Sequence, residues 1–540
     1  MRAKLPGACD AIVTGSIFAG PSSIRELMVE LASERRERRA RRVGRDRAPL
    51  AQLPWQQPRR HFAPLKLLSD DQIETIHRAS LDLLEEIGMD ILLPEARQIF
   101  AAAGATVEGE RVRIGRDIIE AALGTAPEEF TFHARNPGRS IRIGGNWIAF
   151  APVGGPPNCS DADHGRRPGT FEDNANFIRL AQHFNCIHTA GGGSTDALDV
   201  HASVRHLRIG LNKVLLSDKV LFTSSTGRAR LFDGMEMARI ARGLTPDQFQ
   251  AEPSVFTMIN TNSPLKLDGP MAMGVIEMAR RGQITCVTPF TLAGAMAPVT
   301  LAGALAEQNA EALAGLALNQ LARPGAPFIY GGFTSNVDMK SGAPAFGTPE
   351  YMKAAVGGGQ MARRYRLPYR TSNTCAANAV DAQAAYESVF SLWGAIMGGG
   401  NLIMHAAGWM EGGLVGAYEK FALDCDLLQM LESFLEPLDT SDDALGLEAI
   451  REVGPGGHFF GAAHTLQRYA TAFYAPMVSD WRNFQQWSAA GRPLADQKAN
   501  SIWKQALAEY REPSIDPAIR EALVDFVERR VREGGEKTDF

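Results

Sequence analysis

One repeated pattern, from Trp147 to Leu435, limits the folds open to this chain. A short run of aliphatic, aromatic or β-branched residues ends near Gly, Ser, Thr or Asn, and a longer segment with helical spacing of apolar residues follows it. The short runs are residues 147–153, 186–192, 219–225, 254–260, 284–290, 327–333, 368–373 and 402–408. Because these runs are largely apolar, they predict strands buried on both faces, as in a parallel sheet.

The segments with helical spacing are residues 172–184, 200–216, 229–242, 268–281, 302–322, 349–364, 381–398 and 418–435. Eight strands alternating with eight helices predict an α/β fold, the (β/α)8 or TIM barrel, by the number of units and by size. A doubly wound open sheet is the alternative, since periodicity does not show closure. No G-x-G-x-x-G motif opens the first unit and no GxxxxGK[ST] motif occurs, so nucleotide chemistry is not indicated.

We expect the barrel to occupy residues 147–436, with further segments on either side. Residues 1–65 should form a disordered or extended basic tail, because the run ERRERRARRVGRD at 34–46 is cationic and lacks apolar periodicity. A polyanion-binding or docking arm is the alternative for this tail. Residues 66–146 should form an N-terminal α+β cap, beginning with a helix capped by Ser69. Residues 437–540 should form a C-terminal helical cap.

Composition and charge exclude several classes of function. The net charge of −5 provides no global basic field, so we expect no nucleic-acid partner. The six cysteines are scattered singly and no His/Cys cluster has zinc-ligand spacing, so we expect no bound metal. No run approaches the roughly 18 uninterrupted apolar residues of a membrane span, and the N-terminus lacks the features of a secretory signal. We therefore expect a cytoplasmic protein without a membrane partner.

Functional groups of such a barrel lie at the carboxyl ends of the strands and in the loops that follow them. The candidate substrate-binding residues at these positions are Phe222, Phe290, Tyr330, Phe333, Asn373, Asn378, His405, Trp409 and Glu411. Backbone amides of Gly191, Gly192 and Gly193 are candidates for approaching a cofactor or ligand. No catalytic triad, paired carboxylates or metal-ligand spacing occurs among the strand ends. Such a site binds and orients a substrate, while the reactive centre comes on another molecule.

Each candidate also has a purely structural interpretation. We expect His405 to hold a substrate carboxylate through a hydrogen bond, although a core histidine with satisfied partners is the alternative. Glu411 is functional only if it faces inward, which the sequence does not show. The aromatic rings could equally pack in the core, and Asn373 and Asn378 could cap turns. Cys375 has no placed histidine partner, so we do not expect it to act as a nucleophile.

Two stretches carry a family resemblance. Residues 69–114 begin SDDQIETIHRASLDLLEEIG, and residues 329–415 contain TSNTCAAN and LIMHAAGWMEGG. Both stretches resemble the trimethylamine methyltransferase family, and the resemblance extends from about residue 65 to about residue 515. It implies a (β/α)8 fold and methyl transfer to the cob(I)alamin of a separate corrinoid protein.

One segment of the sequence distinguishes two branches of that family. Members that demethylate trimethylamine carry pyrrolysine, and we expect its position to fall within residues 371–378, which here read TSNTCAAN. The chain therefore resembles the branch without pyrrolysine, whose characterised substrates are quaternary amines such as glycine betaine. A quaternary nitrogen leaves as a neutral amine and needs no further activation, and aromatic faces recognise its permanent charge.

Three alternatives to this function remain open at this point. A sulfonium compound would suit the same aromatic site. A barrel lyase or isomerase would require a lysine or carboxylate at a strand end, and the strand ends offer no lysine. A non-catalytic betaine-binding protein would bind without transferring a methyl group. We expect a small quaternary amine and a corrinoid protein as partners, and self-association into a homo-oligomer.

Overall fold

The computed structural model of the protein describes residues 49–191 and 194–536. The chain divides into two compact units, residues 1–49 and 50–540, and the description below concerns the second unit. The cationic run at 34–46 lies outside the described residues. Residues 50–65 are extended and ordered, and Arg60 lies buried where Nη1 donates to the Gly400 carbonyl over 2.9 Å.

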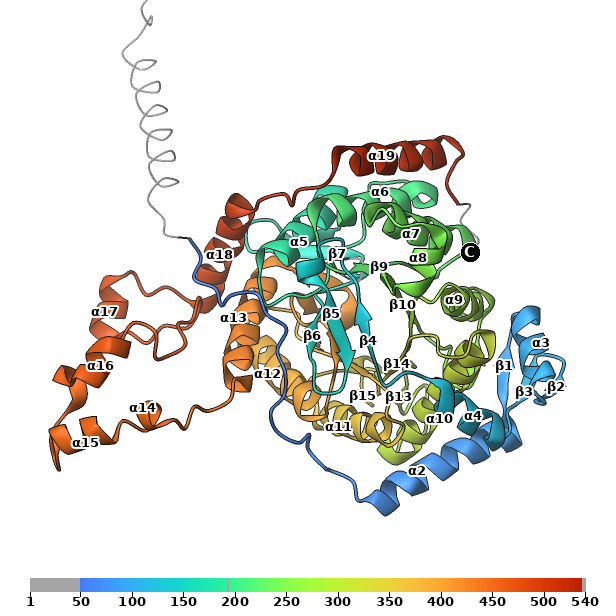
Figure 1. Ribbon diagram of the computed structural model, residues 1–540, viewed down its shortest axis with the longest axis horizontal. Coiled ribbons are helices and arrows are strands. Elements are labelled where there is room, and N and C mark those ends of the chain that lie inside the picture. The colour runs from blue at the N-terminus through green and yellow to red at the C-terminus, as the bar shows by residue number, and fades with distance from the viewer. Residues whose placement is uncertain (1–48, 192–193, 537–540) are drawn as a thin grey trace, which may run out of the picture. The chain divides into compact units, whose positions relative to one another are not determined.

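A parallel sheet of seven strands forms the centre of this unit (Figure 1). In spatial order the strands are β6 (Ala149–Phe150), β18 (Leu402–Met404), β17 (Tyr369–Ser372), β14 (Phe328–Gly331), β12 (Ile284–Val287), β10 (Val255–Ile259) and β9 (Leu221–Phe222). All neighbouring pairs are parallel. Seven of the eight expected strands are therefore present, and their carboxyl ends share one edge of the sheet.

The expected strand at 186–192 is not formed among the described residues, so the sheet is not the closed eight-stranded barrel that the repeat predicts. Residues 188–190 nevertheless lie between β6 and β9. The His188 amide donates to the Phe150 carbonyl (2.8 Å), and the Ala190 amide donates to the Val220 carbonyl (3.0 Å). The Phe150 amide donates to His188 Nδ1 (3.1 Å), so a side chain occupies a position that a backbone carbonyl takes in a regular ladder.

Eight helices follow the strand positions and surround the sheet (Figure 1). They are α5 (Phe171–His183), α6 (Ala202–Leu216), α7 (Arg228–Ala241), α9 (Gly269–Arg280), α10 (Leu301–Ala322), α11 (Pro349–Arg364), α12 (Ala382–Met397) and α13 (Tyr418–Leu435). Each lies within two residues of its predicted bounds. A short helix, α8 (Pro246–Ala251), is additional. Helix α10 is buried on all sides because the N-terminal helices cover its outer face.

The amino ends of the strands are covered by an antiparallel hairpin. Its strands β4 (Glu129–Phe132) and β5 (Ile141–Gly144) place Phe132 and Ile143 in the same apolar cluster as the inward residues Phe256 and Ile329. Phe132 meets Phe256 edge to face, with ring centroids 5.7 Å apart. This end of the sheet is therefore closed by packing, and the carboxyl ends remain for a site.

The remaining N-terminal elements pack on α10. They are α2 (Asp70–Asp82), a π-helical turn (Leu83–Ile87), β1 (Met89–Ile91), α3 (Pro94–Ala102), β2 (Thr106–Glu108), β3 (Arg111–Arg113) and α4 (Arg116–Thr125). Ser69 caps the start of α2 as expected, and together with Gln72 it forms a capping box. Strand β1 pairs in parallel with β11 (Lys266–Leu267), which joins these elements to the loop after β10.

Small strands extend the loops beyond the carboxyl ends of the sheet. One set is β13 (Leu292–Ala293), β15 (Ser335–Val337) and β16 (Pro344–Ala345); the other is β7 (Asn158–Asp161), β8 (Gly165–Pro168), β19 (Trp409–Met410) and β20 (Val415–Ala417). Strand β20 pairs in parallel with β7, so loops that are distant in the sequence are joined at this end.

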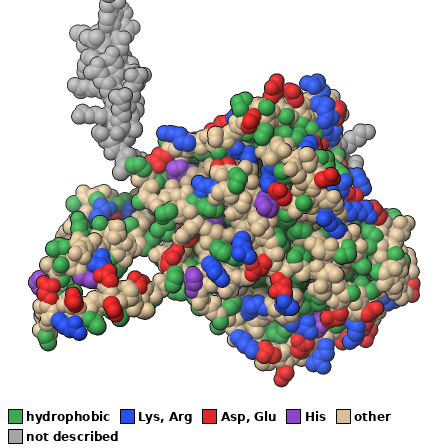
Figure 2. All heavy atoms as spheres, viewed as in Figure 1, with side chains coloured by type: hydrophobic (Ala, Val, Ile, Leu, Met, Phe, Trp, Pro, Cys, Tyr) green, Lys and Arg blue, Asp and Glu red, His purple; other side chains and the backbone are tan. Residues whose placement is uncertain are grey.

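The C-terminal segment contains six helices. They are α14 (Asp442–Leu445), α15 (Leu447–Val453), α16 (Ala463–Arg468), α17 (Phe484–Ala489), α18 (Ala495–Glu509) and α19 (Pro517–Arg532). Helix α18 packs on α13 and α5, and α19 packs on α6 and α7. The segment 437–494, called the arm below, exposes many hydrophobic side chains (Figure 2). Among the described residues, no helix has both the length and the apolar character to cross a membrane.

The hairpin should stabilise the whole sheet. Replacing Phe132, which is 1% exposed, by Ala should lower the free energy of unfolding by about 3–5 kcal/mol, because the ring leaves a cavity against Phe256. The decrease is measured as a shift of the urea midpoint. Thr131→Ala, on the exposed face of the same strand, is the matched control and should change it by less than about 0.5 kcal/mol. Equal shifts in both variants would contradict this role of the hairpin.

Candidate functional site

Four aromatic rings gather beyond the carboxyl ends of the sheet. Phe290 follows β12, Phe333 follows β14, and Phe346 and Trp409 come from the loops that extend these ends. The centroid of the Phe333 ring lies 5.1 Å from that of Phe290, 5.6 Å from that of Phe346 and 6.3 Å from that of Trp409. Phe346 and Trp409 are buried, whereas Phe290 and Phe333 are partly exposed. The aromatic cluster therefore has rings accessible on one side.

His405 joins this cluster at the end of β18. Its ring stacks on Trp409, with centroids 5.2 Å apart and planes 21° apart, and Nδ1 lies 3.2 Å from Ser372 Oγ. The backbone of His405 has φ 57°, a left-handed conformation that costs energy in a residue with a side chain. Burial and the cation of Arg370 together place the pKa of His405 well below 6.5. The imidazole is therefore neutral and donates or accepts hydrogen bonds without carrying charge.

Arg370 is a buried cation beside the cluster. It lies in β17, where Tyr369 turns to α11 and donates to the Ala355 carbonyl, so the alternation of the strand directs Arg370 to the interior. Its guanidinium lies 5.1 Å from the centroid of the Phe333 ring, and Nη1 donates to the Gly332 carbonyl over 3.3 Å.

The charge of Arg370 has no counter-ion. Its Nε is buried without a hydrogen-bond partner, and no carboxylate within the described ranges forms an ion pair with it. Burial lowers the pKa of Arg370, which reports the cost of holding this charge away from water. An isolated buried guanidinium is costly unless an anion binds it. The sequence signal was one charged residue inside the run PYRTSN, and we did not predict Arg370 from it.

Asn373 is also placed at this end of the sheet. It follows β17 directly and is buried; Nδ2 donates to the Ala406 carbonyl over 3.3 Å, and Oδ1 has no partner. Gly191, at the carboxyl end of the expected second strand, has φ 104°. A Cβ at Gly191 would lie 3.1 Å from Ser194 Oγ, so the turn requires glycine. Gly192 and Gly193 lie outside the described residues.

Four other predicted residues lie apart from the cluster. Tyr330 faces away from the sheet interior and donates to Asn309 Oδ1 of α10 over 2.9 Å. Phe222 packs edge to face on Phe256, within the interior cluster near the hairpin. Asn378 is exposed. Glu411 lies at the rim, where Oε2 accepts from Arg166 Nε over 3.0 Å; its charge is therefore already paired.

Cys375 has the properties of a structural cysteine. The side chain is fully buried, and burial raises the pKa of its thiol to about 12. A thiol with that pKa contains almost no thiolate at neutral pH, and the thiolate is the nucleophilic form. These properties are those of a structural thiol, and the absence of a nucleophilic role for Cys375 stays a prediction.

Among the described residues, Asp161, Asp163 and His164 form a group with the geometry of potential metal ligands. Their carboxylates already have partners, however. Asp161 accepts from Arg167 over 2.6 Å and Asp163 pairs with Lys504 over 2.5 Å. These cations neutralise the acidic charge, so the group is explained as an ion-pair cluster that joins β7 and β8 to α18.

Comparison with known proteins assigns the family. The family model for trimethylamine methyltransferase matches residues 34–535. The chain belongs to the trimethylamine methyltransferase family. It is 36% identical over 472 residues to a glycine betaine methyltransferase of Desulfitobacterium hafniense, covering 87% of this chain and 98% of that protein. It is 28% identical over 471 residues to a trimethylamine methyltransferase of the same species, covering 86% and 94%.

A solved structure is also similar to this family member. The monomethylamine methyltransferase of Methanosarcina barkeri has 12% sequence identity and a TM-score of 0.49, and the match covers 83% of this chain and 88% of that one. Within this family member, residues 371–378 begin in β17 and run past Asn373 at the site. The segment in which we expected the pyrrolysine position therefore adjoins Arg370 and the aromatic cluster.

The protonation of His405 can be tested directly. Because its folded-state pKa is lowered, its contribution to stability is complete above pH 6.5, the ordinary value, and declines as the pH falls from there toward the folded-state value. NMR of the imidazole rings should show His405 neutral at pH 6.5, with His405→Gln used to identify its signal. A His405 ring that is half protonated at pH 6.5 or above would contradict the proposed burial beside Arg370.

Proposed function

We propose that this protein transfers a methyl group from a quaternary amine that carries a carboxylate, a betaine, to the corrinoid of a separate protein. The observation that supports this best is the buried guanidinium of Arg370, which has no counter-ion and lies against the Phe333 ring. A betaine supplies the missing anion and a permanent cation in one small molecule. The 36% identity to a glycine betaine methyltransferase supports the same substrate class.

The two charges of a betaine suit two neighbouring parts of the site. The carboxylate binds Arg370, and His405 adds a hydrogen bond at the same end of the site. The trimethylammonium group lies against the partly exposed rings of Phe290 and Phe333, which attract a cation through their faces. Asn373 contributes a buried amide oxygen, Oδ1, that otherwise lacks a partner.

The hydrogen bond that we expect from His405 to the substrate carboxylate comes, in this proposal, from a neutral ring. A histidine that binds a carboxylate gains most when it is charged, but the lowered pKa keeps His405 neutral. The charge therefore comes from Arg370, and His405 orients the carboxylate. Its hydrogen bond to Ser372 Oγ and its stacking on Trp409 fix the ring. A neutral ring also avoids adding a second positive charge near the ammonium group.

Among the described residues, no side chain of the site provides the nucleophile that the reaction requires. Cys375 is protonated, and the neutral His405 has one ring nitrogen engaged with Ser372. The corrinoid in its cob(I)alamin form supplies the electron pair that accepts the methyl group. The C–N bond breaks, its electron pair remains on nitrogen, and the tertiary amine leaves without needing a proton. The residues of the site therefore bind, orient and dehydrate the substrate, which is what an in-line displacement requires.

Arg370 should determine the preference for a carboxylate. Wild-type protein should methylate cob(I)alamin from glycine betaine and not from trimethylamine, which has neither fixed charge nor carboxylate. Arg370→Met should reduce kcat/KM for glycine betaine by about 10- to 150-fold, because a charge-assisted hydrogen bond is lost. The same variant should act on tetramethylammonium, which lacks a carboxylate, at least as well as wild type does. Methylcobalamin formation is measured spectroscopically.

Arg323→Met, at the far end of α10, is the matched control and should react like wild type. Equal losses for both donors in Arg370→Met would contradict a carboxylate contact. Rapid demethylation of trimethylamine would contradict the substrate class. Faster transfer from a dimethylsulfonio acid would assign the sulfonium class, and saturable betaine binding without any methyl transfer would assign a binding protein.

His405 should act on binding through its hydrogen bond. His405→Ala should reduce kcat/KM for glycine betaine by about 10- to 150-fold and should leave tetramethylammonium unaffected. His405→Gln, which retains an N–H donor, should recover part of the loss. Cys375→Ser, in the neighbouring loop, is the control and should keep nearly the wild-type rate. Abolished activity in Cys375→Ser, with an unchanged circular dichroism spectrum, would show that the thiol takes part in the reaction.

A further inference from the structure

The loop between β18 and β19 carries the stacked rings of His405 and Trp409. Its last residue, Gly408, has φ 87°. A Cβ there would lie 3.0 Å from the Phe421 ring, so the backbone comes this close to α13 only because the residue is glycine. The Gly408 amide donates to Asp424 Oδ2 of the same helix over 2.9 Å. The loop is therefore attached to α13 between the two rings.

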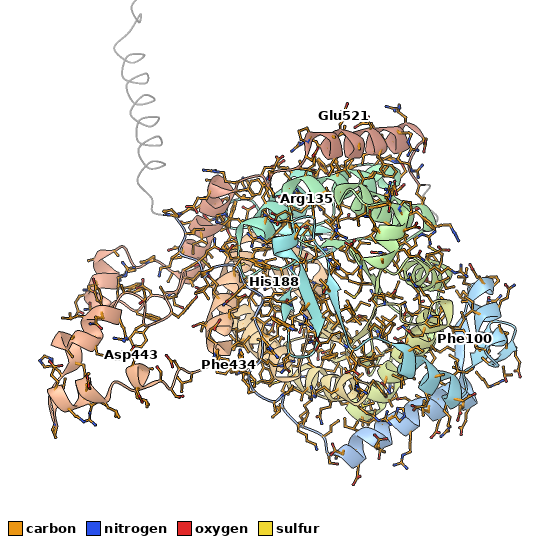
Figure 3. The ribbon with its side chains drawn as sticks, viewed as in Figure 1. Phe100, Arg135, His188, Phe434, Asp443 and Glu521 are labelled. Carbon is orange, nitrogen blue, oxygen red and sulfur yellow. The ribbon has the colours of Figure 1, made fainter. Side chains whose placement is uncertain are left out.

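The carboxylate of Asp424 also accepts from a buried lysine. Lys420 Nζ, one turn earlier in α13, lies 2.5 Å from Oδ1 and 2.6 Å from Oδ2, and it donates to Ser388 Oγ of α12 over 2.6 Å. Lys420 is 1% exposed and Asp424 is 2% exposed. Both residues lie in the first half of α13, whose other end is marked by Phe434 in Figure 3.

An ion pair this deeply buried is costly to form. Burial raises the pKa of the Asp424 carboxyl, although Lys420 acts in the opposite direction. Well-packed apolar side chains of similar volume often stabilise a protein as well as such a pair or better. Stability alone therefore does not explain the pair. A carboxylate, however, is a stronger acceptor for a backbone amide than a neutral group is.

We infer that Asp424 is a positioning residue of the site, whose carboxylate is held by Lys420 and fixes the Gly408 amide. The fixed amide sets the orientation of His405 against Trp409. The left-handed backbone of His405, with φ 57°, needs such support, because this conformation persists only where the surrounding structure determines it. That His405 orients a substrate carboxylate rests on the proposed function, whereas the attachment of the loop to α13 does not.

Two kinds of substitution separate this role from a contribution to stability. Lys420→Met/Asp424→Leu replaces the ion pair by apolar side chains, which is often neutral for stability, but it leaves the Gly408 amide without its acceptor. Asp424→Asn removes the charge and retains an oxygen that can accept from this amide. Asp233→Asn is the matched control, because Asp233 of α7 is a buried carboxylate, 5% exposed, that pairs with Arg530 of α19.

Hydrogen exchange, followed by mass spectrometry without substrate, measures the loop directly. Peptides that contain residues 405–408 should exchange at least about tenfold faster in Lys420→Met/Asp424→Leu, because the protecting hydrogen bond is lost. The urea midpoint of that variant should stay close to the wild-type value. Exchange of the same peptides in Asp424→Asn and in Asp233→Asn should stay within about threefold of the wild-type rate.

Methyl transfer from glycine betaine measures the consequence for the site. The kcat/KM of Lys420→Met/Asp424→Leu should fall by about 10- to 100-fold, because a misplacement of about 1 Å has an effect of this order. The loss for tetramethylammonium should be smaller. In a His405→Ala background the same double substitution should cost less than about threefold, because Asp424 acts through His405. Asp233→Asn should react like wild type.

Three results would overturn the inference: wild-type exchange at residues 405–408 in the double variant, an equal loss of kcat/KM in Asp233→Asn, or an undiminished further loss in the His405→Ala background. If the double variant does not fold, Asp424→Ala and Asp424→Asn make the same comparison, since both remove the charge and only Asn retains the oxygen. Equal exchange in these two variants would also overturn it. A wild-type chain that transfers no methyl group would contradict the proposed function, and the exchange rates would still decide the role of Asp424.

Discussion

The charge of Arg370, held in the interior of the sheet without a counter-ion, is the constraint on which the rest of the site depends. The Gly332 carbonyl and the face of the Phe333 ring reduce the free-energy cost of burying this charge, but they do not remove it. Burial, together with this charge, lowers the pKa of His405 and so determines how that residue can act. It also repels a cation that brings no anion with it. A bare trimethylammonium group would therefore be disfavoured, while the proposed betaine substrate would neutralise the repulsion as it binds.

The surrounding backbone is arranged so that these groups fit together. A Cβ at Gly332 would lie 2.9 Å from Tyr369 Oη, and a Cβ at Gly331 would collide with Thr288. The two glycines let the chain after β14 pass close to its neighbours and present Phe333 to Arg370. The left-handed conformation of His405 is likewise imposed by its surroundings. Packing at the amino ends, where Phe132 meets Phe256, is separate from these strained loops.

The repeat of strands and helices could be predicted from the sequence because apolar periodicity is a local property. The absence of the expected strand at 186–192 could not be predicted, because it depends on the contact of the His188 side chain with the Phe150 amide. The alternation along β14 directs Tyr330 to α10, whereas Phe333 lies beyond the end of the strand. The two glycines between these residues have no side chains, so the sequence does not show which face each aromatic residue occupies.

The site residues that the sequence did not reveal were also hidden for physical reasons. Phe346 joins the cluster from a loop that turns back through β15 and β16, and no periodicity marks such an excursion. In the sequence, Arg370 is one charged residue in a run that predicts a buried strand. Its importance for the site follows only from the three-dimensional structure, in which no described carboxylate pairs with it. Glu411 was a reasonable candidate by position, yet its partner Arg166 is distant in the sequence and satisfies its charge at the rim.

The two ends of the sheet therefore have different physical tasks. At the amino ends a hairpin fills the interior, and the arm leaves with its apolar surface unburied. At the carboxyl ends the described loops hold a cation, aromatic faces and an imidazole of lowered pKa, and the described residues there include no nucleophile for the proposed reaction. A site that, as proposed, binds one reactant and lacks the other would have to remain open to a second protein at this end of the sheet.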